Sequence, residues 1–220
     1  MRVWRYTQLE MSPVYALFHY LFYSLHHTFF RGEVAGIENI PITGPFLLAA
    51  NHASHLDPAG IGGNVPRQLA FFARKTLWKG GVLSWWMDQA GCIPVDRDGG
   101  SDVSAIKRVL RALQDGRALL LFPEGTRSPD GELQPPKSGV GMIACRAKVP
   151  VVPVRIFNSN RAWGRGGPLK LGQAVDITYG PALQLADFDD PTAGKQRYQV
   201  ASEHIMAAIA KLEPAPTLVV

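Results

Sequence analysis

Apolar positions along the chain form short continuous runs, separated by polar turns and by stretches of helical periodicity. Two continuous runs, residues 46–50 and 117–122, each end in a turn of small and polar residues. A short apolar run bounded by turn signals is typical of a buried strand. Residues 68–73 and 175–179 are further strand candidates. We therefore predict that these four segments belong to one central sheet.

Helical stripes predict two helices among these strands. One helix is expected to begin at a cap formed by Ser101 and Asp102 and to end near Gly116. Its apolar stripe consists of Val103, Ile106, Val109, Leu110 and Leu113. A last helix is expected over residues 194–212. Its inward positions are Tyr198, Ala201, Ile205, Ile209 and Leu212. Residues 158–168 contain several glycines and are interpreted as a mobile polar linker.

The N-terminal segment 11–30 is aromatic and apolar, with two different faces at helical spacing. One face consists of Val14, Leu17, Phe18, Leu21, Phe22, Leu25 and Phe29. The other carries Tyr15, His19, Tyr23, His26 and His27. A spanning helix would bury these imidazoles in hydrocarbon, which is costly, and no signal cleavage site follows. We interpret residues 1–31 as an amphipathic, membrane-associating helix whose histidine face is wet. An ordinary helix packed on the core is the open alternative.

Composition adds limits on the class of protein. The chain has 220 residues, of which 46% are hydrophobic, so it is globular and long enough for one α/β domain with a proper core. With the alternation of strand and helix segments, we expect this domain to occupy residues 32–220 and to contain a mixed central sheet flanked by helices. Cys92 and Cys145 stand in apolar contexts without paired spacing, which indicates reduced thiols in a cytosolic environment. The net charge of +5 favours anionic partners such as phospholipid head groups. Dispersed basic residues and the lack of a known motif argue against nucleic acid.

Candidate chemistry begins directly after the first predicted strand. His52 follows that strand, and Asp57 stands five residues later. Five residues rotate an ideal helix by roughly 140° off the starting face, so these side chains need a turn between them in order to pair. Asn51, Ser54 and Pro58 are suitable turn and cap residues. In such a turn Asp57 would fix the tautomer of His52, a candidate general base. The alternatives are a hydrogen-bonded loop histidine and a metal site, although no second ligand cluster completes one.

A second polar turn follows the run 117–122. It carries Glu124, Gly125, Thr126 and Arg127. Gly125 permits a sharp turn, and the guanidinium of Arg127 is shaped to bind a phosphate or a carboxylate through two hydrogen bonds. The turn is therefore a candidate anion-binding site. A surface arginine and a local ion pair between Glu124 and Arg127 are the open alternatives.

Four sequence blocks follow one another in a fixed order. The first is Asn-His-x-Ser-x-x-Asp over residues 51–57, and the third is Phe-Pro-Glu-Gly-Thr-Arg-Ser over residues 122–128. The second, a Gly-x-Ile-x-x-x-Arg block over residues 91–97, is the loosest match because a proline stands where an aromatic residue is more usual. The fourth is Val-Pro-Val-Val-Pro-Val over residues 149–154. Together they resemble the glycerophospholipid acyltransferase family, of the 1-acyl-sn-glycerol-3-phosphate acyltransferase type.

This resemblance implies a reaction in phospholipid synthesis. An acyl group would pass from a thioester, carried by CoA or an acyl carrier protein, to a hydroxyl of a lysoglycerophosphate acceptor. His52 would be the general base and Asp57 its orienting partner. No metal and no cofactor beyond the thioester co-substrate are expected. The substrate-binding residues that the resemblance implies are Lys75, Arg97, Glu124, Gly125, Thr126 and Arg127.

The same resemblance supports a peripheral or monotopic location at the cytoplasmic face of the cell membrane, because family members commonly carry a membrane-associating N-terminal element. Two other functions are compatible with the sequence. The first is acyl transfer to another acceptor, such as a different lysolipid, a glycolipid or an ornithine lipid. The second is a non-catalytic peripheral lipid-binding protein, against which the intact polar residues of the blocks argue.

Overall fold

A seven-stranded mixed sheet forms the centre of the molecule in a computed structural model, which describes residues 11–95 and 103–215. The strand order is β1-β7-β6-β2-β5-β3-β4, and the β6–β7 pair is the antiparallel one. The strands are β1 (Val34–Ala35), β2 (Phe46–Ala50), β3 (Leu69–Arg74), β4 (Ile93–Val95), β5 (Ala118–Leu121), β6 (Val151–Phe157) and β7 (Asp176–Tyr179). The mixed α/β sheet that the sequence predicted is confirmed.

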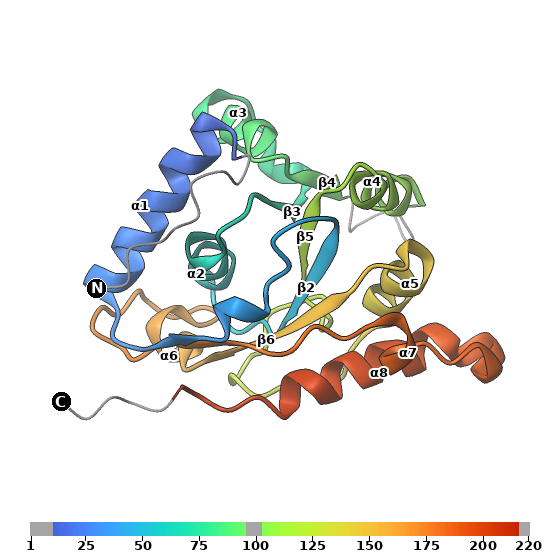
Figure 1. Ribbon diagram of the computed structural model, residues 1–220. Coiled ribbons are helices and arrows are strands. Elements are labelled where there is room, and N and C mark those ends of the chain that lie inside the picture. The colour runs from blue at the N-terminus through green and yellow to red at the C-terminus, as the bar shows by residue number, and fades with distance from the viewer. Residues whose placement is uncertain (1–10, 96–102, 216–220) are drawn as a thin grey trace.

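Helices cover both faces of this sheet (Figure 1). They are α1 (Pro13–Phe29), α2 (Asp57–Asn64), α3 (Gly81–Gln89), α4 (Val103–Gln114), α5 (Gly139–Ala147), α6 (Ser159–Trp163), α7 (Leu185–Phe188) and α8 (Arg197–Ala210). Short 3₁₀ turns are η1 (Ile37–Asn39), η2 (Lys75–Leu77) and η3 (Pro191–Gln196). Helices α1 and α2 lie on one side of the sheet, whereas α4, α5 and α8 lie on the other.

Strand β2 illustrates why its run of apolar residues is continuous. Successive side chains of a strand point to opposite faces of the sheet. Phe46 and Leu48 enter the core beneath α2, and Leu47 and Ala49 enter the core beneath α4, α5 and α8. Because both faces are covered, every residue of β2 is buried. Because β2, β3, β5 and β6 run parallel, their carboxyl ends meet at one edge of the sheet.

Helix α1 packs on α2 through the face that was expected to be wet, and this part of the prediction is wrong. Tyr15 is only 4% exposed, and its hydroxyl accepts a hydrogen bond from the backbone N–H of Leu69 at 3.2 Å. His19 donates from Nδ1 to the carbonyl oxygen of Gly62 at 2.9 Å. That carbonyl belongs to the last turn of α2, where helix carbonyls lack partners within their own helix. The polar face of α1 thus satisfies the end of α2.

Asn64, the last residue of α2, is the centre of a second polar contact with α1. Its amide nitrogen donates to Nδ1 of His26 at 3.1 Å, and its oxygen lies 3.0 Å from Nε2 of His27. Burial, followed by the charge of His27, lowers the pKa of His26 to about 4, so this imidazole is neutral at physiological pH. A side chain on Gly63 would approach the backbone nitrogen of Tyr23 to 2.8 Å, so the two helices need glycine at this crossing.

The apolar face of α1 is largely directed to the outside. Its exposed members are Leu17, Leu21, Leu25 and Phe29, and the neighbouring Tyr20 is exposed as well. Phe18 and Phe22 differ from the rest of the predicted face because their rings contact Trp86 of α3, at centroid distances of 5.1 and 6.2 Å. Within residues 11–95 and 103–215, no helix combines the length and the hydropathy required to cross a bilayer.

The other helix predictions are mixed in outcome. Helices α4 and α8 occupy the segments where stripes were found, and Val109, Ala201 and Ile205 are fully buried as predicted. The proposed cap at residues 101–102 lies outside the described residues. The interpretation of residues 158–168 as a linker is wrong, because α6 occupies the first half of that segment. Both cysteines are free, Cys145 buried and Cys92 partly buried.

Candidate active site

His52 and Asp57 form a hydrogen-bonded pair at the carboxyl end of β2. Nδ1 of His52 lies 2.8 Å from Oδ2 of Asp57, whose side chain is fully buried at the first residue of α2. The same oxygen accepts the backbone N–H groups of Ala53 and Ser54, each at 2.7 Å. These bonds create the turn that the five-residue spacing required. Because Nδ1 faces the carboxylate, Nε2 is the nitrogen that remains for a substrate.

The third block, which follows β5, holds the backbone of His52. The N–H of His52 donates to Oε1 of Glu124 at 3.0 Å, and the carbonyl oxygen of His52 accepts the N–H of Ser128 at 2.7 Å. The ring of Phe122 stacks on the imidazole, with 4.0 Å between centroids and 16° between planes. The imidazole is therefore fixed through its side chain by the first block and through its backbone and ring face by the third.

Asn51 and Ser54, which the sequence indicated only as turn residues, connect the site to more distant segments. The amide of Asn51 donates to the carbonyl of Ile156 at 2.9 Å and accepts the N–H of the same residue at 2.7 Å. This pair of bonds extends the β2–β6 ladder past the end of β2. The hydroxyl of Ser54 donates to the carbonyl of Trp163 at 2.8 Å, which joins the turn to α6.

Glu124 is a buried carboxyl, only 3% exposed. Burial raises its pKa to about 7, and the nearby charge of Asp57 acts in the same direction. Its hydrogen bond with the His52 N–H acts in the opposite direction and lowers the pKa. Glu124 forms no ion pair with Arg127 in the described part of the chain, so the alternative of a local ion pair between these two residues does not apply.

Glu124 should make the stability of the protein depend on pH. Between the ordinary glutamate pKa of 4.5 and about 7 the native state binds more protons than the unfolded state, so the free energy of unfolding should fall as pH rises through this window. Glu124→Gln keeps an oxygen for the His52 N–H and should flatten that fall. Denaturant unfolding across this pH range measures the effect, with Glu213→Gln on the surface as control. An unaltered profile in Glu124→Gln would contradict the assignment.

Arg127 provides positive charge beside the pair. Its Nη1 is buried and has no hydrogen-bond partner within the described residues. The next residue, Ser128, donates its backbone N–H to the carbonyl oxygen of His52 at 2.7 Å, so the third block holds Arg127 beside the first block. Slight desolvation lowers the pKa of His55, and the positive charge of Arg127 acts in the same direction. Buried donors are normally satisfied. An unpaired guanidinium N–H at this place is suited to an anionic ligand.

Gly125 and Lys137 lie together at the same turn. Gly125 has a φ of +71°, in the left-handed region that favours glycine, and a Cβ there would approach Cδ of Lys137 to 3.1 Å. The lysine side chain therefore lies across Gly125, close to the third block.

The other predicted substrate-binding residues make no contact that ties them to the His52–Asp57 pair within the described part of the chain. Lys75 follows β3 and is exposed at the same sheet edge as His52, without a hydrogen bond to the pair among the residues described. Thr126 is exposed in the turn of the third block. Arg97 lies outside the described residues, two positions beyond β4. The structure thus brings together His52, Asp57, Glu124 and Arg127.

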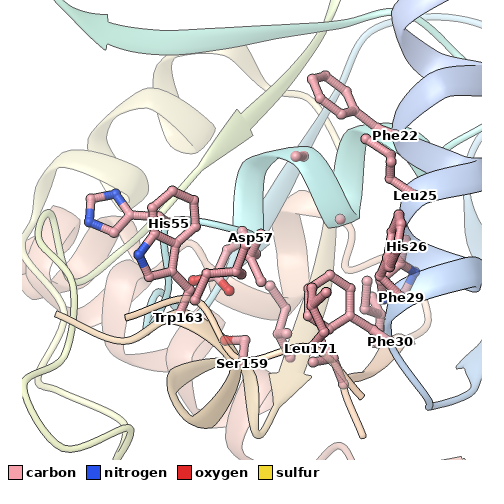
Figure 2. A pocket seen from close by; sticks show the side chains of 17 residues that line it. Phe22, Leu25, His26, Phe29, Phe30, His55, Asp57, Ser159, Trp163 and Leu171 are labelled. Atoms are coloured by element: carbon pink, nitrogen blue, oxygen red, sulfur yellow. The ribbon is translucent and has the colours of Figure 1, made fainter. Parts of the chain in front are cut away.

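Apolar space adjoins the polar pair. A cavity of about 460 Å³ reaches Asp57 and extends between α2 and the second half of α1. Figure 2 shows Phe22, Leu25 and Phe29 on one side of this cavity and Asp57 and Trp163 on the other. The free Nε2 of the fixed imidazole can accept a proton from a hydroxyl group. The unpaired guanidinium can bind an anionic group on the same molecule, and the adjoining cavity can hold its hydrocarbon chain.

Comparisons with known proteins agree with this chemistry. A family model described as Acyltransferase matches residues 31–157. A 1-acyl-sn-glycerol-3-phosphate acyltransferase of Bacillus subtilis is 30% identical over 184 residues, which cover 82% of this chain and 87% of that protein. A chloroplastic enzyme of the same name from Brassica napus is 31% identical over 159 residues, 70% of this chain and 46% of its own length. The alpha form of Homo sapiens is 37% identical over 129 residues, 56% of this chain and 44% of its own length.

The chain therefore spans less than half the length of the plant and human relatives that it matches. Among solved structures, the 1-acyl-sn-glycerophosphate acyltransferase of Thermotoga maritima superposes with a TM-score of 0.70 at 26% sequence identity. The superposition covers 91% of this chain and 78% of that one.

Proposed function

The chain belongs to the acyltransferase family that its four sequence blocks indicated, and from this premise we propose that it transfers an acyl group from a thioester to a hydroxyl of a lysoglycerophosphate acceptor. The names of its relatives support the acceptor class. The 2.8 Å contact between His52 and Asp57 is the observation that carries the proposal, because an oriented imidazole is what a hydroxyl nucleophile needs.

In the proposed reaction, Nε2 of His52 accepts the proton of the acceptor hydroxyl. The hydroxyl oxygen attacks the thioester carbonyl carbon, an ester C–O bond forms, and the C–S bond then breaks. The imidazolium returns its proton to the departing thiolate. Asp57 stays ionised throughout and stabilises the imidazolium, aided by the Ala53 and Ser54 N–H groups that bind its Oδ2. No acyl-enzyme is needed, because the thioester is already activated.

The acceptor phosphate is proposed to bind Arg127, with Lys75 and Arg97 as further cationic partners. The unpaired Nη1 of Arg127 supports this role. Glu124 is proposed to act through the backbone of His52, whose N–H donates to its Oε1, and not as a second base. Gly125 and Thr126 shape the turn that presents the guanidinium.

A donor–acceptor assay tests the proposed function. Thiol release from palmitoyl-CoA or palmitoyl-acyl carrier protein should require lysophosphatidate and should yield phosphatidate. A lysolipid without a terminal phosphate, a glycolipid and a lyso-ornithine lipid serve as competing acceptors. Preference for one of these would redirect the proposal to another acceptor, and the absence of thiol release with all of them would favour a non-catalytic lipid-binding protein.

Peripheral association with the cytoplasmic membrane surface belongs to the same proposal. The exposed apolar face of α1 supports it, because apolar side chains on an amphipathic helix bind the acyl boundary of a bilayer. The net charge of +5 adds attraction to anionic lipids. Both thioester carriers are soluble on the cytoplasmic side.

The double substitution Leu17→Asp with Leu21→Asp should release the protein from vesicles. Both side chains are exposed, and losing the burial of two leucines in lipid removes at least about 3 kcal/mol, or roughly 100-fold in partitioning. Vesicle co-sedimentation with phosphatidylglycerol liposomes measures the binding. The control is Gln114→Asp with Ala186→Asp, which makes the same charge change at exposed positions of α4 and α7. Equal loss in both double variants would indicate a general charge effect and contradict docking through α1.

A further inference from the structure

The connection between α6 and β7, residues 164–175, is fixed to the end of α1 (Figure 1). Helix α6 follows the carboxyl end of β6, and β7 runs antiparallel to β6, so this α6–β7 loop lies at the sheet edge where the parallel strands end. Gly172 donates its N–H to the carbonyl oxygen of Phe29, the last residue of α1, at 2.7 Å. Arg31 donates its N–H to the carbonyl oxygen of Gln173 at 2.9 Å. The loop and the end of α1 therefore form one surface beside the active site.

Two leucines of the α6–β7 loop extend the exposed apolar face of α1. Leu169 is 48% exposed and Leu171 is 54% exposed. Both line the same cavity as Leu25 and Phe29 of α1, which are 39% and 42% exposed. Figure 2 shows Leu171 with Phe29 and Phe30 at one end of this cavity. Because monomeric soluble proteins rarely expose large contiguous apolar patches, such a surface indicates an interaction site.

Positive charge surrounds these two leucines. Arg161 on α6 and Arg165 and Lys170 in the loop are exposed. Residues 159–175 contain no aspartate and no glutamate, so these three cations have no acidic neighbour along the chain. Apolar side chains next to basic ones are the combination that binds the acyl boundary and the phosphate groups of an anionic bilayer. The charge of the loop therefore favours an anionic lipid surface as its partner.

The backbone of the α6–β7 loop is held in place from both sides. The N–H of Lys170 donates to the carbonyl oxygen of Ala162 on α6 at 2.7 Å, so the leucines that flank Lys170 are fixed next to α6. On the other side, the bonds to Phe29 and Arg31 join the loop to α1. A surface that is already ordered loses little conformational entropy when it binds. The loop can thus contact a bilayer without refolding.

We propose that the α6–β7 loop is a second membrane contact, in which Leu169 and Leu171 enter the acyl boundary of an anionic bilayer and the nearby cations bind its phosphate groups. This inference rests on the peripheral association that belongs to the proposed function, and it adds the orientation of the bound protein. A single amphipathic helix can rotate about its own axis on a membrane, whereas a second contact fixed to its end prevents that rotation. The sheet edge that carries His52 is then held against the lipid surface.

Removing the three cations tests the electrostatic part of the contact. The triple variant Arg161→Ala, Arg165→Ala, Lys170→Ala should weaken partitioning onto phosphatidylglycerol vesicles about 100-fold, because each basic residue near an anionic surface contributes roughly 5-fold. Weak binding to phosphatidylcholine vesicles should stay unchanged. The matched control removes the same charge at exposed positions elsewhere, with Lys107→Ala, Lys195→Ala and Lys211→Ala. Equal loss in both triple variants would show that net charge alone drives binding and would overturn the proposal.

A fluorescent label in the loop tests insertion directly. Leu171→Cys in the full chain, with Cys92→Ser to leave one accessible thiol, is labelled with the environment-sensitive fluorophore NBD. Its emission should shift to shorter wavelength on phosphatidylglycerol vesicles, because the probe leaves water. A label at Ile42→Cys is the control, since Ile42 is 61% exposed and precedes the amino end of β2, at the opposite edge of the sheet. An equal shift at both positions, or no shift at Leu171 in vesicle-bound protein, would contradict the inference.

The outcomes separate this inference from the proposed function. If the protein transfers acyl groups to lysophosphatidate and binds vesicles through α1 alone, with a silent label at Leu171, the loop contact fails and the proposed function stands. If no acyl transfer is detected but the label shifts and the cation variant is released, the enzyme proposal fails and the loop contact stands. Absence of binding to any vesicle would point to a protein partner for this surface and overturn the proposal.

Discussion

Replacing His52 with alanine should reduce turnover by about 10²–10⁴-fold while the fold and vesicle binding survive. The imidazole is the one group on the described site whose free nitrogen can accept the hydroxyl proton, since its other nitrogen is bound to Asp57. Its ring is partly exposed and contacts Phe122, so truncation leaves the backbone links to the third block intact. Thiol release under saturating donor and acceptor measures the effect.

Asp57→Asn should leave a small residual rate, because the imidazole remains but loses the charge that stabilises its protonated form. The double variant His52→Ala/Asp57→Asn should be no slower than His52→Ala alone, as expected for two residues that act as a unit. Asp57→Asn also disturbs two backbone N–H bonds, so thermal unfolding must accompany the kinetics. A His52→Ala protein with most of the wild-type rate would refute the mechanism.

Replacing Arg127 with alanine should weaken binding of the acceptor far more than binding of the donor. Loss of one charge-assisted contact costs about 1.5–3 kcal/mol, which corresponds to roughly 10–150-fold in acceptor KM. Arg127→Lys should restore part of this loss, because an ammonium carries the charge but cannot present two parallel N–H groups. Steady-state kinetics with lysophosphatidate and with palmitoyl-CoA separate the two substrates.

Arg111→Ala is the matched control for this charge change. Arg111 forms an exposed ion pair with Asp115 on α4, so its loss should leave both Michaelis constants near wild type. Equal acceptor constants in wild type, Arg127→Ala and Arg127→Lys would refute phosphate recognition by Arg127. A parallel rise in the donor constant would assign Arg127 to the thioester carrier instead.

Several parts of the site followed from local pattern. The continuous run Phe46–Ala50 predicted a buried strand, and the strand occupies the same residues. The spacing of His52 and Asp57 required a turn and not a regular helix, and the structure contains that turn. Gly125 was read as a sharp turn, and its φ of +71° agrees. These features depend on residues within one or two turns of each other, so neighbouring letters are enough to define them.

Other parts depend on segments far apart along the chain. Local pattern predicts the wrong buried face of α1, because histidines are usually solvated, whereas Gly62 and Asn64 at the end of α2 supply their hydrogen-bond partners here. The role of Glu124 was not evident from its block, because its partner is the His52 N–H, 72 positions away. The residues next to a polar side chain in the sequence do not show which distant group will be its hydrogen-bond partner.

The sequence by itself therefore determined the strand that ends two residues before His52, the turn that returns Asp57 to His52, and the four blocks that identify the family. Only the tertiary structure decided which face of α1 is inward, which residues hold the His52 backbone, and where the apolar cavity beside Asp57 lies. The physical reason is that periodicity and turn chemistry are local, whereas hydrogen-bond partners and cavities arise when strands β2, β5 and β6 bring their carboxyl ends to one edge.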